Sequence, residues 1–190
     1  MSRGLSGPRE RPAAAIWAVV IIVAAIVISI LANWRTPATD ALPDGVPDTA
    51  QAAVVDRVVD GDTVRVLTDA GEELTVRLIG VDTPETVDPG EPVQCYGPEA
   101  SAFTAQTLPE DSNVFLERDP SQGDVDRYGR TLAYLWHVDT LDGAQLLNYE
   151  LVAGGYAREY TYDTDYRYQR QLRTAQDTAR SARAGLWGVC

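Results

Sequence analysis

The chain has 190 residues and a formal net charge of −12 at pH 7, and 45% of its residues are hydrophobic. This length allows one domain of about 135 to 140 residues with an extension, which is enough to bury a core. The only histidine, His137, follows an apolar run and fits the end of a strand. Metal centres and catalytic sites that need two histidines are therefore excluded.

The N-terminal part contains an uncharged run of 20 residues, 13–32, which is long enough to span a bilayer. Three arginines precede this run and one follows it closely, so residues 1–12 are expected in the cytoplasm and the C-terminal domain outside the cell. A cleaved signal peptide is the alternative, but its apolar region usually has about 7 to 15 residues and ends at a small-residue cleavage site. Ile30-Leu31-Ala32-Asn33-Trp34 makes a poor site of that kind. We expect an uncleaved, single-pass anchor in the cell membrane.

Residues 33–51 are rich in proline and aspartate and poor in large apolar residues, which is typical of an extended linker. Residues 36–190 hold 12 arginines against 27 acidic residues, a net charge of −15. Such an acidic body argues against tight, extended binding of a polyanion. A bound cation and a few arginines can nevertheless create a locally positive cleft.

The domain at 52–190 alternates strand and helix patterns. Asp69-Ala70-Gly71 forms a turn between strands, Pro98-Glu99 is typical of a helix start, and Gly154-Gly155 of a helix end. Strands are expected at 53–59, 63–68, 73–81, 113–118 and 130–138, and helices at 98–108, 144–153 and 166–182. Five short strands with interleaved helices indicate a domain of the α+β class.

Two segments at strand ends combine acidic and basic side chains. The first reads Asp60-Gly61-Asp62-Thr63, which taken alone is a hairpin turn. The second is an apolar strand that carries Arg77 and ends in Asp82-Thr83-Pro84-Glu85. Carboxylate oxygens are ligands that Ca²⁺ and Mg²⁺ prefer, and a planar guanidinium suits a phosphate. Together the two segments predict a metal-and-phosphate site.

Two further motifs lie later in the chain, Tyr96-Gly97-Pro98-Glu99-Ala100-Ser101-Ala102-Phe103 and Asp126-Arg127-Tyr128-Gly129-Arg130. With the two segments above, they resemble the staphylococcal nuclease (thermonuclease) family in content, order and approximate spacing, over residues 52–187. The resemblance implies an OB-type barrel with about three helices. It also implies an endonuclease that hydrolyses phosphodiester bonds of DNA and RNA.

The resemblance assigns roles to the acidic residues. Asp62 and Asp82 would supply carboxylate ligands to Ca²⁺, with the main-chain carbonyl of Thr83 as a further ligand and water completing the shell. Glu85 stands where the family has the acid that positions or deprotonates the attacking water. The plainer alternative for these residues is a turn with a solvated face.

The resemblance also assigns roles to two arginines. Arg77 and Arg130 match the pair that binds the phosphate and stabilises the charge that develops on it. The alternative for both is a surface salt bridge, which a residue beside the Tyr128-Gly129 turn would suit.

Tyrosines form a third group of candidates. Tyr128 and Tyr160 match substrate-contacting tyrosines of the family, and Tyr162 would lie on the same side of an extended segment as Tyr160, where rings can stack on a base. Packing is the alternative, because five of the nine tyrosines lie within 156–168. The loop at 86–94 is acidic, whereas secreted members of the family often carry lysines there. Arg127, next to Tyr128, is the nearest substitute for a basic residue beside that tyrosine.

The two cysteines, Cys95 and Cys190, lie in the part of the chain expected outside the cell. A disulfide is the economical interpretation there. A metal site or a catalytic thiol is the alternative, but neither has histidine partners in this chain.

The sequence thus favours a monomeric, membrane-anchored, extracellular Ca²⁺-dependent endonuclease. The resemblance implies products with 3′-phosphate and 5′-hydroxyl ends. A non-catalytic OB-fold module that binds nucleic acid or another protein is the alternative, and an adhesion or scaffold domain is a third. Neither of these explains a complete set of five candidate residues, namely Asp62, Arg77, Asp82, Glu85 and Arg130.

Overall fold

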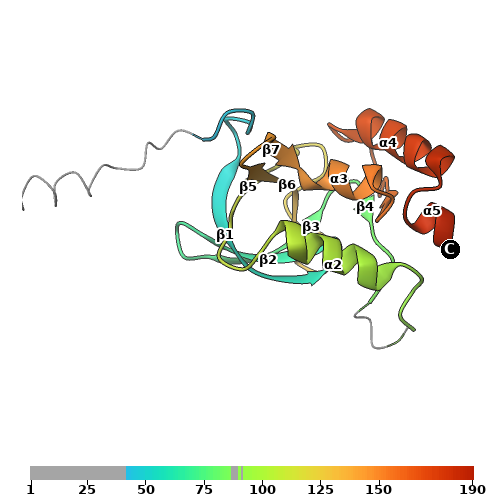
Figure 1. Cartoon of the computed structure of the whole chain (residues 1–190). Helices are drawn as coiled ribbons and strands as arrows, with labels where there is room; N and C mark the ends of the chain where they lie inside the picture. Colours follow the sequence, from blue (N-terminus) through green and yellow to red (C-terminus); the bar gives the residue numbers. More distant parts are fainter. Residues whose placement is uncertain (1–41, 87–89, 91) are drawn as a thin grey trace, which may run out of the picture. The chain divides into compact units, whose positions relative to one another are not determined.

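The computed structural model of the chain describes residues 42–86, 90 and 92–190 (Figure 1). Its strands are β1 (Gln51–Asp60), β2 (Thr63–Thr68), β3 (Glu73–Leu78), β4 (Val81–Asp82), β5 (Asn113–Glu117), β6 (Thr131–Asp139), β7 (Gly143–Leu146) and β8 (Arg158–Glu159). Its helices are α2 (Gly97–Thr107), α3 (Leu147–Ala153), α4 (Gln169–Ala182) and α5 (Leu186–Val189).

Five of these strands close into a barrel. Neighbours pair in the order β3-β2-β1-β5-β6, and a parallel pairing between β3 and β6 joins the two ends of the sheet. In that pairing Arg77 lies opposite Leu132. β7 extends the sheet beyond β6, and β4 pairs separately with β8. The closed five-stranded barrel, with α2, α3 and α4 around it, fits the predicted OB-type fold.

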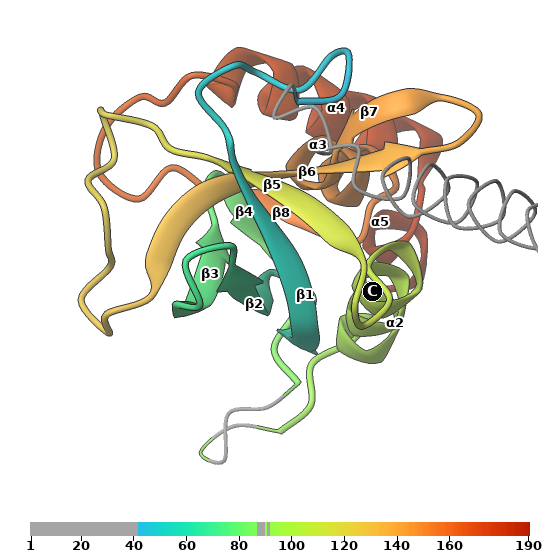
Figure 2. The same ribbon diagram turned by 90° about the vertical axis from the view of Figure 1, so that its left-hand side faces the viewer.

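The core lies inside the barrel and under the helices. Side chains point alternately inward along the strands, and Val55, Val64, Val66, Val76, Leu78 and Leu116 are at most 1% exposed. Leu151 of α3 and Leu172 of α4 complete the same core. Burying a leucine stabilises a fold by about 1.5 to 3 kcal/mol, so α3 and α4 are held by apolar packing. α2 packs beside β1 (Figure 2).

The predicted strand at 73–81 is two strands, which corrects the prediction. β3 ends at Leu78 and β4 begins at Val81, because Gly80 between them has a φ of +76°. A Cβ at Gly80 would lie 2.6 Å from the Tyr166 ring, so only glycine fits. The break turns the chain away from the barrel, which lets β4 pair with β8.

Other element boundaries also differ from the prediction. The helix expected at 144–153 begins at Leu147, because 143–146 forms β7 against β6. The helix expected at 166–182 begins at Gln169. β8 and α5, with two and four residues, are too short to leave a periodic pattern in the sequence.

The predicted linker at 33–51 is described from residue 42 onward, and within that part residues 43–50 form turns while Gln51 begins β1. Val46 donates its N–H to the Pro43 carbonyl and Ala50 donates to the Pro47 carbonyl, which closes two turns. Val46 is only 6% exposed. These residues therefore belong to the domain, which begins near residue 42 rather than at 52.

No helix within residues 42–86, 90 and 92–190 is long and apolar enough to cross a membrane. The predicted span at 13–32 and the predicted cytoplasmic segment at 1–12 lie outside the described residues. The anchor stays a prediction.

Candidate active site

Arg77, the guanidinium predicted to bind phosphate, lies on β3 at one end of the barrel. Its Nη1 donates to the carbonyls of Leu78 (2.9 Å) and Val81 (2.6 Å). Its Nη2 lies 3.1 Å from Oδ2 of Asp62 and 3.5 Å from Oδ1 of Asp82. Both predicted carboxylate ligands therefore meet at this arginine, whose position is fixed before any substrate binds.

Asp62 lies in the tight turn between β1 and β2. Its Oδ2 accepts the main-chain N–H of Thr83 (3.0 Å), and its Oδ1 accepts the Thr63 hydroxyl (3.1 Å). A Cβ at Gly61 would lie 2.7 Å from Cγ2 of Thr83, so glycine is needed for the two segments to approach. The Thr104 hydroxyl of α2 donates to the Gly61 carbonyl (2.7 Å). The hairpin turn seen in the sequence thus also places Asp62 against Thr83.

Asp60, which the sequence indicates only as a turn residue, belongs to the same cluster. Its Oδ1 accepts the main-chain N–H of Asp62 (3.2 Å). Burial, and next the Asp62 carboxylate, raises the pKa of Asp60 to about 6, and Glu85 adds to the rise. The turn therefore brings a second buried carboxyl group to the site.

Asp82 is the other predicted carboxylate ligand, and it ends β4. Burial raises its pKa above the ordinary value; Arg77 opposes that rise, and Asp62 and Glu85 add to it. Glu85 lies three residues later, outside any helix or strand, and its Oε1 accepts the N–H of Thr86 (2.8 Å). The acidic groups of this cluster repel one another, which is the electrostatic setting that a cation relieves.

The donor chemistry suits a hard cation such as Ca²⁺, because carboxylates and a main-chain carbonyl all offer oxygen. Within the described part of the chain, however, no three His, Cys, Asp or Glu side chains converge as a metal cluster. A cation held by Asp62 and Asp82 would therefore also need the Thr83 carbonyl and water as ligands.

Arg130, the second predicted phosphate-binding arginine, immediately precedes β6. Its Nε donates to Oδ2 of Asp126 (2.7 Å), and its Nη1 lies 3.5 Å from the Thr63 hydroxyl. Thr63 in turn donates to Asp62, so one hydroxyl connects the second arginine with the carboxylate that pairs with Arg77. The parallel pairing of β3 and β6 brings both arginines to the same end of the barrel.

Asp126 holds Arg130 in place, a role that the sequence did not reveal. Its Oδ1 accepts the main-chain N–H groups of Tyr128 and Arg130, both at 2.9 Å. Burial opposes ionisation, but these hydrogen bonds and the Arg130 side chain lower the pKa of Asp126 below its ordinary value. The carboxylate therefore stays charged and fixes the turn that carries Arg130.

The predicted substrate-binding residues lie on the surface. Tyr128 and Tyr162 are 68% and 69% exposed, and the rings of Tyr160 and Tyr162 lie 6.2 Å apart. The Arg127 guanidinium stands 4.7 Å from the Tyr128 ring centre and donates to its hydroxyl (2.6 Å). The exposure of Tyr128 and Tyr162 does not fit the packing alternative, which suits Tyr166 and Tyr134, both buried in the core. Exposed rings beside arginine are available to stack on bases.

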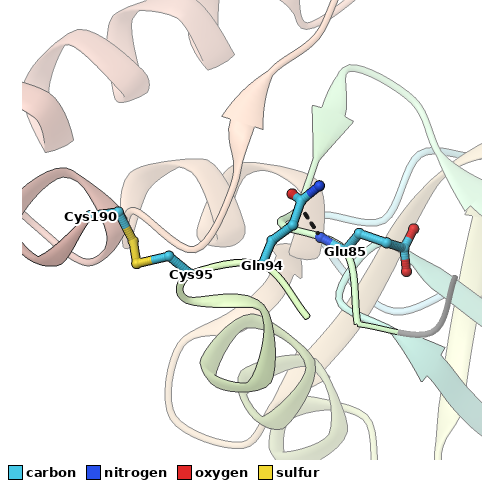
Figure 3. Close-up of a disulfide and its surroundings, with 4 residues drawn as sticks. All are labelled: Glu85, Gln94, Cys95 and Cys190. Atoms are coloured by element: carbon cyan, nitrogen blue, oxygen red, sulfur yellow. Dashed lines mark hydrogen bonds between the residues drawn. A yellow bond between two sulfur atoms is a disulfide. The ribbon is translucent and has the colours of Figure 1, made fainter. Parts of the chain in front are cut away.

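Cys95 and Cys190, the predicted pair, are joined by a disulfide that closes a separation of 95 positions (Figure 3). No free cysteine remains among the residues that the structure covers. The bridge ties the start of α2 to the end of α5.

Comparison with known proteins agrees with this geometry. A family model described as "Staphylococcal nuclease homologue" matches residues 75–189. A thermonuclease of Staphylococcus hyicus is 40% identical over 170 residues, which are 89% of this chain and 94% of that protein. A thermonuclease of Staphylococcus intermedius is 42% identical over 137 residues, 72% of this chain and 76% of that protein. Endonuclease YncB of Bacillus subtilis is 38% identical over 135 residues, 70% of this chain and 60% of that protein.

Proposed function

This chain belongs to the staphylococcal nuclease family, and on that premise we propose that it is a Ca²⁺-dependent endonuclease of DNA and RNA, anchored in the cell membrane. That it is a nuclease, hydrolysing phosphodiester bonds, is supported by its thermonuclease and endonuclease relatives. The metal, the range of substrates and the anchor are parts of the proposal.

One observation carries the proposal: Arg77 stands between two carboxylates, and a single threonine hydroxyl connects that cluster with Arg130. The two guanidinium groups offer donors to a phosphate, and the neighbouring carboxylates offer oxygen ligands to a cation. A non-catalytic OB-fold module needs only a binding surface, so it gives no reason for this cluster.

In the proposed reaction a water oxygen bonds to phosphorus and the bond from phosphorus to the 5′ oxygen breaks. Glu85 orients that water and takes one of its protons, which it later returns to solvent. The 5′ oxygen gains a proton from solvent water and leaves as a hydroxyl. Arg77 and Arg130 bind the phosphate oxygens and stabilise the charge that develops on them. The products are a 3′-phosphate and a 5′-hydroxyl. Because the attack needs no 2′-hydroxyl, both DNA and RNA should be cleaved.

Asp62, Asp82 and the Thr83 carbonyl would hold the Ca²⁺ ion. When bound, the ion supplies a fixed positive charge that polarises the phosphate. Arg77 also pairs with both carboxylates, so it keeps them in place between turnovers.

The test is product analysis with the full-length protein purified in detergent. Plasmid DNA and RNA are incubated with Ca²⁺ or with EGTA, and the ends are typed by phosphatase and kinase treatment. Cleavage of both polymers only with Ca²⁺, giving 3′-phosphate ends, is expected. An identically purified Arg130→Ala preparation controls for contaminating nuclease. Binding without cleavage would instead favour the non-catalytic module.

Asp126→Asn should lower kcat about tenfold, because the amide that replaces Oδ2 cannot accept the hydrogen bond from Arg130, a charged bond of roughly 1.5 to 3 kcal/mol. KM should change little, since the tyrosine surface is intact. The measurement is steady-state kinetics on a fluorescent oligonucleotide.

Asp139→Asn is the matched control for that substitution. Asp139 likewise accepts two main-chain N–H groups through Oδ1, from Leu141 and Asp142, in the loop after β6. An equal loss of kcat in both variants would mean that Asp126 acts only on stability.

Salt should weaken DNA binding only modestly. Arg77, Arg130 and Arg127 would neutralise about two or three phosphates. The logarithm of the association constant for DNA should then fall with log[salt] at a slope of about −2 to −3. At low ionic strength the acidic body repels DNA, because screening extends over about 30 Å at 0.01 M, so the first additions of salt should tighten binding. The measurement is Kd against monovalent salt at fixed free Ca²⁺. A slope steeper than about −5 would require an extended basic surface.

The membrane anchor is tested by topology. Protease added to intact cells should release an active domain, and the cut should fall before residue 42, since the chain folds into two turns over residues 43–50. Full protection of the domain would place it inside the cell, and release without protease would favour a cleaved signal peptide.

A further inference from the structure

Glu85 needs a fixed main chain if its carboxylate is to orient water, and Gln94 provides part of that support. The Gln94 N–H donates to the Glu85 carbonyl (2.9 Å), and the Glu85 N–H donates to Oε1 of Gln94 (3.2 Å). Figure 3 shows the Glu85 carboxylate pointing away from Gln94, so these main-chain contacts leave it directed elsewhere. Gln94 thus forms hydrogen bonds with both the main-chain N–H and the main-chain carbonyl of Glu85.

The same stretch of main chain rests on the first turns of α2. A Cβ at Gly97 would lie 2.9 Å from the Pro84 carbonyl and 3.1 Å from the Glu85 carbonyl, so the two backbones are in direct contact. The Thr86 and Ser101 hydroxyls lie 3.3 Å apart. Glu85 is therefore fixed from two sides, by α2 and by Gln94.

Gln94 is itself held by the disulfide, because the next residue is Cys95. Cys190, its partner, comes after α5, and α5 is fastened to the body where the Leu186 N–H donates to the Gly155 carbonyl (2.8 Å). The bridge therefore connects Gln94 to the C-terminal end of the fold, on the side of Gln94 away from Glu85 (Figure 3).

We propose that Gln94, held by the Cys95–Cys190 disulfide, is a positioning residue that fixes Glu85 for the reaction. The inference rests on the proposed function, in which Glu85 acts on the attacking water. Small displacements of a catalytic group lower the rate steeply, which makes main-chain support of this residue important.

Gln94→Leu tests the role, because leucine keeps the size of the side chain but lacks the accepting oxygen. We expect kcat to fall about tenfold with KM within about twofold, as for a small displacement of a catalytic group. Gln94→Glu keeps an accepting oxygen and should restore most of the rate. Gln145→Leu is the control, because it also removes one hydrogen bond between a glutamine side chain and the main chain, from Nε2 of Gln145 to the Asp142 carbonyl. It should keep the wild-type rate.

A double-mutant cycle separates positioning from general damage. In a Glu85→Ala background, Gln94→Leu should cause no further loss, because no carboxylate remains to be positioned. The same fractional loss in both backgrounds would overturn the inference. The full-length protein carrying both Cys95→Ser and Cys190→Ser should show the kcat loss of Gln94→Leu while circular dichroism confirms that it is folded. A wild-type kcat in that folded variant would overturn the part assigned to the disulfide.

A measurement without catalysis keeps this inference distinguishable from the proposed function. Hydrogen exchange of the Glu85 amide should speed up at least several-fold in Gln94→Leu and stay slow in Gln94→Glu. Unchanged exchange would overturn the support that Gln94 gives, even in an active enzyme. Faster exchange in a protein that never cleaves nucleic acid would instead overturn the proposed function.

Discussion

Arg130→Ala is expected to lower kcat by about two to three orders of magnitude, the usual cost of removing one preorganised donor to a developing negative charge. The fold should survive, because this side chain contacts Asp126 and Thr63 at the end of the barrel and does not belong to the apolar core. Single-turnover cleavage of an oligonucleotide at saturating Ca²⁺ measures the effect.

Arg65→Ala is the matched control for Arg130→Ala. The Arg65 side chain is 31% exposed against 30% for Arg130, and it also pairs with acidic residues, Asp56 and Glu73, but on the outer face of β2. Its kcat should stay near the wild-type value. A rate for Arg130→Ala within about threefold of that control would remove Arg130 from the mechanism.

Asp62→Asn should have the largest effect on the metal requirement. The amide keeps the size of the side chain but loses the charge that makes a carboxylate a good Ca²⁺ ligand. The Ca²⁺ concentration for half-maximal activity should rise at least tenfold, and activity at low Ca²⁺ should fall by about two orders of magnitude. The measurement is a Ca²⁺ titration of cleavage, with EGTA as the zero point.

Asp119→Asn controls for the loss of a buried aspartate. Asp119 and Asp62 are each 5% exposed, and Asp119 accepts hydrogen bonds from Tyr134, Ser121 and Arg167. Its replacement should cost about 1 to 3 kcal/mol of stability and leave the Ca²⁺ requirement unchanged. An equal rise in the Ca²⁺ concentration for half-maximal activity in Asp62→Asn and Asp119→Asn would show that the effect of Asp62→Asn is structural.

The sequence was most informative where one short segment carries several functional groups. Asp62, Arg77 and Asp82 could be predicted as neighbours, because each lies in or beside a strand whose end is marked by glycine or proline. The structure brings these three together around the Arg77 guanidinium.

Residues that act across the fold could not be predicted in this way. The Thr63 hydroxyl lies 3.5 Å from Nη1 of Arg130, which is far from Thr63 in the sequence and immediately precedes β6. Asp126 and Gln94 support other residues through hydrogen bonds to main-chain groups, and such contacts leave no pattern in side-chain chemistry. The break at Gly80 was missed because the apolar pattern continues through it, while the Tyr166 ring that demands glycine lies far along the chain.

The closure of the barrel by β3 and β6 also determines how much of the chain must be synthesised before the cluster around Arg77 is complete. Hairpin-connected strands pair early, whereas strands far apart in sequence pair late, after the intervening chain exists. A nascent chain that ends before Thr131 has neither a settled Arg130 nor a partner for the free edge of β3. β8, which holds β4, is made later still. The cluster around Arg77 therefore has all its supporting strands only in a chain that extends through β8.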